Sequence, residues 1–111
     1  MRTLLLLVLS LSSWCVVAAD GDALARGKAI AVDRNKGNCL SCHMMDDGEL
    51  PGNSAPPLLQ MQARFPDRTL LRAQIWDATE RNPETVMPPY GRHRVLTEEE
   101  IDLVVDYVHS L

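Results

Sequence analysis

The sequence predicts an all-α domain of three to five helices, and three observations lead to this fold class. Apolar residues recur at helical spacing in three stretches of the chain, and typical capping residues precede them. No strand-rich pattern is visible. Residues 20–111, which we expect to remain after removal of an N-terminal signal segment, suffice for one domain with a thin hydrophobic core, which a covalently attached group often supplements in small proteins.

The N-terminal segment is typical of a secretory signal peptide. Met1-Arg2 gives a positively charged start, Leu4 to Leu11 form an apolar run, and Val17-Ala18-Ala19 offers a small-residue cleavage site. We therefore expect cleavage after Ala19, with residues 1–19 removed and residues 20–111 forming one domain in the periplasm. The apolar run is too short for a membrane span, so no membrane anchor is expected.

Cys15 offers an alternative interpretation of this segment, as a lipidated cysteine. The preceding Ser12-Ser13-Trp14 is not the small-residue sequence that such sites usually have, so we favour the cleaved signal peptide. After cleavage, Cys39 and Cys42 are the cysteines that remain.

The chain is acidic. Its formal net charge is −4, and residues 20–111 contain ten basic against fifteen acidic residues. This charge disfavours binding to nucleic acid and to anionic membrane surfaces. It is compatible with attraction to a basic patch on a partner protein, and equally with a simply solvated surface.

The first helix is predicted from Asp22 to Arg34. Asp22 is a suitable N-cap, and apolar residues recur one or two turns apart along this segment. Gly27 lowers the helix propensity, and it is either tolerated or marks the close approach of another helix. Gly37 is expected to act as the C-cap that ends the segment.

Cys39-Leu40-Ser41-Cys42-His43 is the most informative motif of the chain. Cys-x-x-Cys-His is the attachment sequence of c-type haem: the two thiols add to the haem vinyl groups, and the imidazole of His43 binds iron. A zinc half-site or a redox-active pair also begins with Cys-x-x-Cys. A zinc site needs two further ligands, and the sequence has no second cysteine pair or His-x-x-x-His to supply them. A redox-active pair is expected near a βαβ pattern, and no such pattern is visible. We therefore expect one covalently bound haem c.

From Asp46 to Pro66 the sequence predicts a long loop, because glycine, asparagine and proline punctuate it. A ligating histidine usually donates its other ring N–H to a backbone carbonyl. The rigid segment Ala55-Pro56-Pro57-Leu58 is well placed to supply one, and we choose Pro56 as the acceptor for His43; the alternative is a merely rigid turn.

The second helix is predicted to begin after the capping residue Asp67 and to end at Asn82-Pro83. Trp76 is expected in the core or near the porphyrin. The apolar stripe of this helix consists of Leu70, Leu71, Ile75 and Ala78.

Met87 is the preferred second axial ligand of the iron. Pro88-Pro89-Tyr90-Gly91 follows it, and this rigid turn can hold a thioether at low entropic cost. Met61, His93 and His109 are the rivals, while Met44 and Met45 adjoin His43 and cannot easily reach the opposite face. A His/Met pair raises the haem potential and closes the iron to substrate, which favours electron transfer.

The third helix begins with a capping box formed by Thr97 and Glu100. Its apolar positions recur at helical spacing at Ile101, Val104, Val105, Val108 and Leu111. The acids Glu98 to Glu100 lie at the positive end of the helix dipole, which is their first role, and a docking patch is a second interpretation.

In its order of elements, the chain resembles a class I cytochrome c over nearly all of residues 22–111. The resemblance rests on the leading helix, the Cys-x-x-Cys-His motif, a methionine-proline turn and a closing helix. It departs at Ala55, where many members have glycine. It implies helices wrapped around one covalent haem, with the first and last helices crossing near a glycine and an aromatic residue, here Gly27 and Tyr107.

Three segments resemble a narrower family, the SoxX subunits of thiosulfate-oxidising SoxAX complexes: residues 37–53, 71–79 and 87–93. This resemblance implies a periplasmic heterodimer with a SoxA-like dihaem or monohaem cytochrome. The complex, an L-cysteine S-thiosulfotransferase, joins thiosulfate to a cysteine of a SoxY-like carrier protein, and the SoxX-like subunit passes electrons to an acceptor cytochrome. The subunit itself is then not catalytic. A free-standing periplasmic electron shuttle is the alternative, and a haem peroxidase would require an open iron position.

Overall fold

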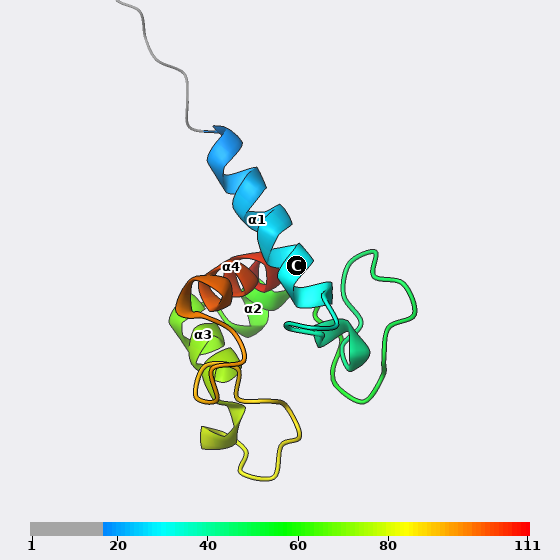
Figure 1. Cartoon of the computed structure of the whole chain (residues 1–111), viewed down its shortest axis with the longest axis vertical. Helices are drawn as coiled ribbons and strands as arrows, with labels where there is room; N and C mark the ends of the chain where they lie inside the picture. The colour runs from blue at the N-terminus through cyan, green and yellow to red at the C-terminus, as the bar shows by residue number, and fades with distance from the viewer. Residues whose placement is uncertain (1–16) are drawn as a thin grey trace, which may run out of the picture.

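The computed structural model describes residues 17–111, and helices dominate its architecture (Figure 1). Within these residues no strand is present, so the predicted all-α class is confirmed there. The predicted signal peptide falls mostly on residues 1–16, which lie outside the described part of the chain. With η for a 3-10 helix, the elements are α1 (Val17–Val32), η1 (Cys39–Ser41), α2 (Met61–Arg64), α3 (Arg68–Trp76), η2 (Ala78–Glu80) and α4 (Glu98–His109).

Helix α1 begins at Val17, five residues before the predicted N-cap. Asp22 therefore lies inside the helix, and its assignment as a cap is wrong. Ala18 and Ala19 have high helix propensity, and they carry the helix toward the N-terminus. Cleavage after Ala19 would remove the first three residues of α1.

The end of α1 also differs from the prediction. The helix ends at Val32 and not at Arg34, and Gly37 is not its C-cap. The Gly37 N–H donates to the Ile30 carbonyl at 3.1 Å, and Asn38 rather than Gly37 has a left-handed conformation, with φ 49°. A Cβ atom on Gly37 would lie 2.8 Å from the Ile30 oxygen and 3.2 Å from Cys39 Sγ. Glycine is needed here for close approach and not for its backbone angles.

Helices α1 and α4 cross at Gly27, as the family resemblance implies. A Cβ atom at this position would lie 2.8 Å from both the Leu103 carbonyl carbon and Tyr107 Cβ, and closer still to the Leu103 oxygen. Any larger residue would push the helices apart, because the contact on the α4 side is backbone. Gly27 therefore marks the close approach that the sequence offered as one of two interpretations.

The predicted loop Asp46–Pro66 contains a short helix, α2, near its end, so the loop prediction is wrong for these four residues. Gln60 precedes α2 with a left-handed φ of 51°, and the Met61 N–H donates to the Leu111 carbonyl at 2.8 Å. A long-range backbone contact thus fixes α2 where local sequence signals are weak. Met61 is buried.

Helix α3 begins as predicted, with the Asp67 side chain accepting from the Thr69 N–H at 2.9 Å. It ends at Trp76, well before Asn82-Pro83, because Asp77 is extended and caps η2 instead. The apolar stripe is buried at Leu71, Ile75 and Ala78, whereas Leu70 is 55% exposed and does not belong to it. Trp76 packs, partly buried, against the core.

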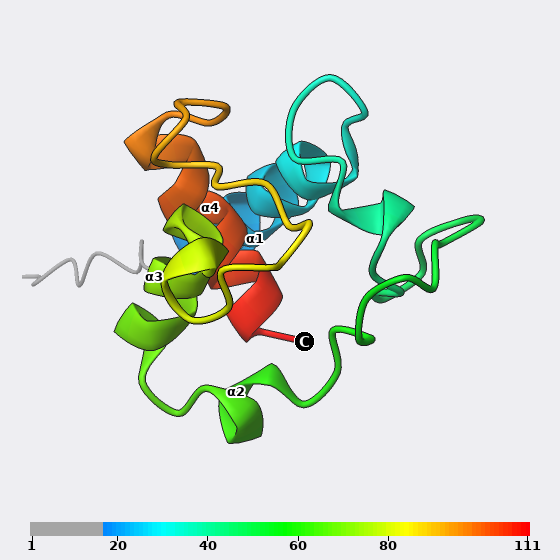
Figure 2. The same ribbon diagram turned by 90° about the horizontal axis from the view of Figure 1, so that it is seen from below.

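Helix α4 has the predicted capping box: Thr97 and Glu100 each accept the backbone N–H of the other. Its buried face forms the centre of the core, and α1 and α3 pack against it. Figure 2 shows α3 and η1 on opposite sides of α4. None of the helices in residues 17–111 has the length and apolar character to cross a membrane. The buried apolar residues are Ile30, Ala31, Met45, Leu58, Met61, Leu71, Ile75, Ala78, Tyr90, Leu96, Ile101, Leu103, Val104, Val105, Tyr107 and Val108.

Candidate functional site

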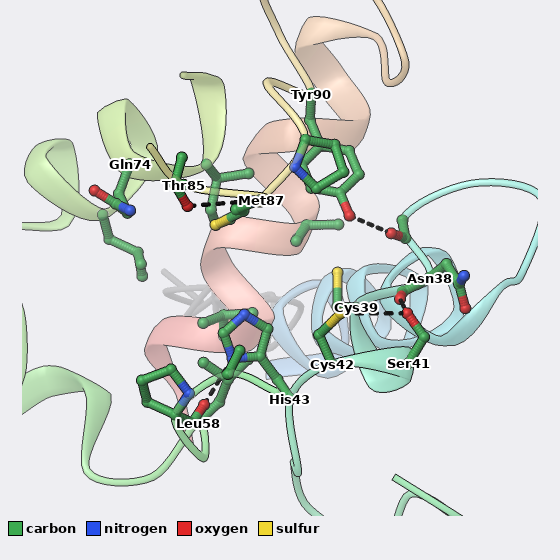
Figure 3. Close-up of a pocket in the computed structure, with 18 of the residues that line it drawn as sticks. Asn38, Cys39, Ser41, Cys42, His43, Leu58, Gln74, Thr85, Met87 and Tyr90 are labelled. Atoms are coloured by element: carbon green, nitrogen blue, oxygen red, sulfur yellow. Dashed lines mark hydrogen bonds between the residues drawn. The ribbon is translucent and has the colours of Figure 1, made fainter. Parts of the chain in front are cut away.

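A cavity of about 790 Å³ lies between these elements. Its size falls in the range of roughly 300–1,000 Å³ that is usual for cofactor pockets. η1 and the residues after it form one wall, α2 and α3 contribute to another, and the segment from Thr85 to Tyr90 closes a third side (Figure 3). Val104 and Val108 of α4 supply part of the apolar lining.

Both cysteines of the Cys-x-x-Cys-His motif line this cavity. A single 3-10 turn brings them together: the N–H groups of Cys42 and His43 both donate to the Cys39 carbonyl, at 3.1 and 2.9 Å. Asn38 begins the turn, and its carbonyl accepts the Ser41 hydroxyl at 2.8 Å. Neither cysteine forms a disulfide, so two thiols are available on the same wall.

The two thiols differ in acidity. Burial raises the pKa of the Cys39 thiol to about 11, whereas hydrogen bonds from Ser54 and Ser41 lower the pKa of Cys42 below its ordinary value. The thiolate is the reactive form of cysteine, so Cys42 is the more nucleophilic of the pair before anything is attached.

His43 is held by the carbonyl that the sequence predicts. Its Nδ1 lies 2.6 Å from the Pro56 oxygen. Because a carbonyl can only accept, the proton resides on Nδ1 and the lone pair of Nε2 is free to bind a metal. Two backbone hydrogen bonds, from Ala55 N to Cys42 O at 3.1 Å and from Leu58 N to Met44 O at 2.8 Å, hold the proline segment beside the histidine. The predicted contact is present, while the roles of His43 and Pro56 toward a cofactor stay predictions.

Met87 lines the same cavity as His43. Figure 3 shows the two side chains on opposite sides of the open centre, with Cys39 and Cys42 beside it. The Met87 N–H donates to the Thr85 hydroxyl at 3.2 Å, and Tyr90 N to the Pro88 carbonyl at 3.0 Å, so the turn is held by its own atoms. An imidazole and a thioether facing one another are a typical axial pair for haem iron.

The rival ligands are less well placed. Met44, Met45, His93 and His109 do not line the cavity. His109 is half-buried rather than at the surface, and its Nε2 lies 3.0 Å from the Phe65 carbonyl.

Met61 is the rival that does line the cavity, and it is nearly fully buried. Its sulfur already accepts from Arg64 Nη1 at 3.2 Å. This contact favours Met87 over Met61 as the thioether that is free to bind iron.

Sequence reasoning missed one residue that shapes the site. The Tyr90 hydroxyl donates to the Gly37 carbonyl at 2.5 Å and so ties the Met87 turn to the segment before Cys39. Burial is the main cause that raises the pKa of Tyr90, which keeps the hydroxyl protonated as a donor. The contact spans 53 positions, and no local pattern predicts it.

The donor set fits the group that the motif implies. The cavity offers two thiols, an imidazole with a free Nε2 and a thioether, among walls that are otherwise largely apolar. Within residues 17–111 no three His, Cys, Asp or Glu side chains converge as they would at a structural zinc site. The cavity therefore suits a large apolar ring fixed by two thioether bonds and two axial ligands.

Comparison with known proteins supports this assignment. The family model described as "Cytochrome C oxidase, cbb3-type, subunit III" matches residues 22–108. A protein of Aquifex aeolicus (strain VF5) described as "Uncharacterized lipoprotein" is 33% identical over 76 residues, which cover 68% of this chain. The matched region spans 37% of that relative's length.

Proposed function

Since this chain belongs to the family of cytochrome c domains described as subunit III of cbb3-type cytochrome c oxidase, we propose that it is the electron-transfer subunit of a SoxAX-like thiosulfate-oxidising complex. Membership in a cytochrome c family implies a covalently bound haem and a role in electron transfer. The single observation that carries the electron-transfer role is the pairing of the Cys-x-x-Cys-His wall with Met87 across one cavity.

The residues of the site have distinct tasks. Cys39 and Cys42 would hold a haem covalently through their thiols, and His43 and Met87 would bind its iron. The Pro56 carbonyl keeps the His43 proton on Nδ1 and so sets the tautomer that binds through Nε2. When bound, haem c supplies a reversible one-electron couple.

Two protein ligands leave the iron closed to substrate. The thioether of Met87 would take the position that a peroxidase leaves open to substrate. This arrangement supports electron transfer and argues against the peroxidase alternative. An absorption spectrum of six-coordinate, low-spin iron is the expected result, and a high-spin spectrum with an open position would contradict it.

The assignment to thiosulfate oxidation rests on the three SoxX-like segments, residues 37–53, 71–79 and 87–93. The first and third contribute Cys39, Cys42, His43 and Met87 to the cavity. Once both thiols are bound to haem, residues 20–111 retain no thiol for sulfur chemistry. The sulfur transfer then belongs to a SoxA-like partner and a SoxY-like carrier, and this subunit passes the electrons on to an acceptor cytochrome.

We place the protein in the periplasm, because c-type haem attachment and the predicted signal peptide agree on that compartment. The Aquifex relative is described as a lipoprotein, which favours the alternative in which Cys15 of this chain carries a lipid. Mass spectrometry of the exported protein separates the two possibilities: a chain that begins near Asp20 supports the cleaved form, and a lipid on Cys15 contradicts it.

A free-standing electron shuttle is the alternative function. An obligate subunit buries a large interface with its partner, whereas a shuttle makes a small, transient one. The test is purification from the native periplasm of cells that oxidise thiosulfate, followed by identification of what elutes with the protein. Recovery with a SoxA-like cytochrome in equal amounts supports the proposal. Recovery only as a monomer, with full haem content, rejects the complex and leaves the shuttle.

A further inference from the structure

The charged side chains that line the cavity all carry the same sign. Four basic residues contribute to its lining and no Asp or Glu does. This bias is notable in a chain whose net charge is −4. The four residues are Arg34, Lys36, Arg64 and Arg81.

Most arginines elsewhere in residues 17–111 are neutralised by carboxylates, with ion pairs at Arg26, Arg68, Arg72 and Arg92. Arg64 and Arg81 have no carboxylate partner among these residues, while Lys36 pairs with Glu100. A positive charge that faces a cavity and has no anionic partner in the protein is available to an anionic group inside the cavity.

Both guanidinium groups are nevertheless held in place. Arg64 Nη1 donates to the Pro57 carbonyl at 2.8 Å and contacts the Met61 sulfur. The Arg81 guanidinium lies over the ring of Phe65, 5.7 Å from its centre. Phe65 directly follows Arg64 in the sequence. A guanidinium has five N–H donors, so each group retains several that these contacts do not use. The pair is positioned around Phe65 and still able to bind.

The two arginines belong to the part of the fold that faces the cysteines. η1 packs on α1, whereas α2 and α3 pack on α4, so the two walls rest on different helices. Figure 3 shows Gln74 of α3 and Thr85 on the side of the cavity away from Cys39 and Cys42. Arg64 ends α2, and Arg81 follows η2, which packs against α3.

Haem carries its two vinyl groups and its two propionates on opposite edges of the ring. A haem fixed through Cys39 and Cys42 therefore directs its propionates away from these residues. We propose that Arg64 and Arg81, with Gln74 on the same wall, form the site that binds the two haem propionates. This inference rests on the haem assigned under the proposed function, but not on the partner complex.

The other basic side chains of the lining, Arg34 and Lys36, come just before the attachment motif Cys39–His43 in the sequence, on the wall opposite α2 and α3. Tyr90 belongs to the third side, which carries Met87. Arg34 thus provides a matched control: it is an arginine of the same cavity without a carboxylate partner among residues 17–111, at the wrong edge for the propionates. Arg94, which is exposed and does not line the cavity, controls for the loss of a distant charge.

The test is proton NMR of the oxidised haem protein, in which the propionate methylene signals are followed against pH. An arginine beside a carboxylate lowers its pKa by roughly 1–3 units. Arg64→Gln and Arg81→Gln should each raise the propionate pKa by an amount of this order and shift the methylene signals. Arg34→Gln and Arg94→Gln should leave both unchanged. Equal effects in Arg34→Gln would overturn the assignment, since they would reflect general charge loss.

The wild-type protein supplies a second measurement that does not depend on the variants being stable. Its propionates should titrate below the ordinary carboxyl range of about 4. Ordinary or raised propionate pKa values would reject the proposal. If the two arginines instead bind an acidic partner surface at the cavity mouth, Arg64→Gln and Arg81→Gln should leave the propionate signals unchanged and should alter the salt dependence of electron transfer. That outcome would also overturn the proposal. Failure to find a SoxA-like partner would reject only the complex.

Discussion

The Tyr90 hydroxyl lies 2.5 Å from the Gly37 carbonyl oxygen, and this hydrogen bond joins the two loops that flank the cavity. One loop presents Met87, and the other leads into Cys39 and Cys42. The distance between the Met87 thioether and the wall that carries Cys39 and Cys42 therefore depends on the Tyr90–Gly37 hydrogen bond, in which none of these three residues takes part.

Removing this hydroxyl should be costly. Tyr90→Phe leaves the carbonyl of a buried glycine without this donor, and we expect a loss of about 1–3 kcal/mol in the free energy of unfolding. Denaturant unfolding of the haem protein measures it. Tyr107→Phe is the matched control, because the buried Tyr107 hydroxyl has no hydrogen-bond partner among residues 17–111, and its removal should cost little. Equal losses in both variants would mean that the Gly37 contact is not the cause.

Met87→Ala should abolish the weak absorption band that methionine-ligated ferric haem shows near the red end of the spectrum, and it should lower the reduction potential. The reason is that Met87 is the cavity-lining thioether whose sulfur is not held by Arg64. Absorption spectroscopy and a redox titration test this. Met61→Leu and the exposed Met44→Leu should both keep the band. Persistence of the band in Met87→Ala, or its loss in Met61→Leu, would move the ligand to another residue.

Gly27→Ala should destabilise the fold by about 1–3 kcal/mol, because its methyl group meets the Leu103 backbone and Tyr107 Cβ where α1 crosses α4. Gly21→Ala lies on the same helix with nothing within 4 Å of the added atom. It should be neutral or stabilising by at most about 1 kcal/mol. Thermal or denaturant unfolding of both variants decides the point, and similar stabilities would show that the crossing can open at little cost.

We expect the carboxylate of Asp77 to make the stability of the fold sensitive to acid. Its side chain is only 3% exposed; it accepts from the Thr79 N–H and hydroxyl and pairs with Arg92 at 3.0 Å. The Thr79 hydrogen bonds, chiefly, hold the pKa of Asp77 below its ordinary value. A carboxyl with a depressed folded-state pKa stabilises the fold above its unfolded pKa of about 3.9, and this stabilisation is lost as the pH falls through the folded-state value.

Asp77→Asn should therefore be less stable than the wild type at neutral pH, and the difference should shrink below about pH 4. Denaturant unfolding at a series of pH values measures this difference. The exposed Glu84→Gln serves as the control, and no comparable pH-dependent gap is expected for it. A gap for Asp77→Asn that stays constant with pH would assign the loss to packing and not to the charge.

Local signals predicted the parts of the fold that local chemistry determines. Asp67 and Thr97 cap their helices as expected, because a cap involves only the next three residues. The predicted start of α1 and the predicted end of α3 were wrong. Ala18 and Ala19 extend α1 toward the N-terminus, and the extended backbone of Asp77 ends α3 early.

The candidate site shows the same division. Cys39, Cys42 and His43 are neighbours in sequence, so their common wall followed from the motif, and the rigid proline segment was enough to suggest Pro56. Arg64 and Arg81 were not singled out, because their meaning depends on which wall of the cavity they occupy. That placement arises from the packing of α2 and α3 on α4, which no local pattern contains.

The lining that Val104 and Val108 provide belongs to the last helix, whereas the two thiols lie in the first half of the chain. A polypeptide that emerges N-terminus first exposes Cys39 and Cys42 before the residues that will cover them have appeared. An enzyme that installs a porphyrin would therefore meet an open segment for as long as the C-terminal helix has not packed over the cavity.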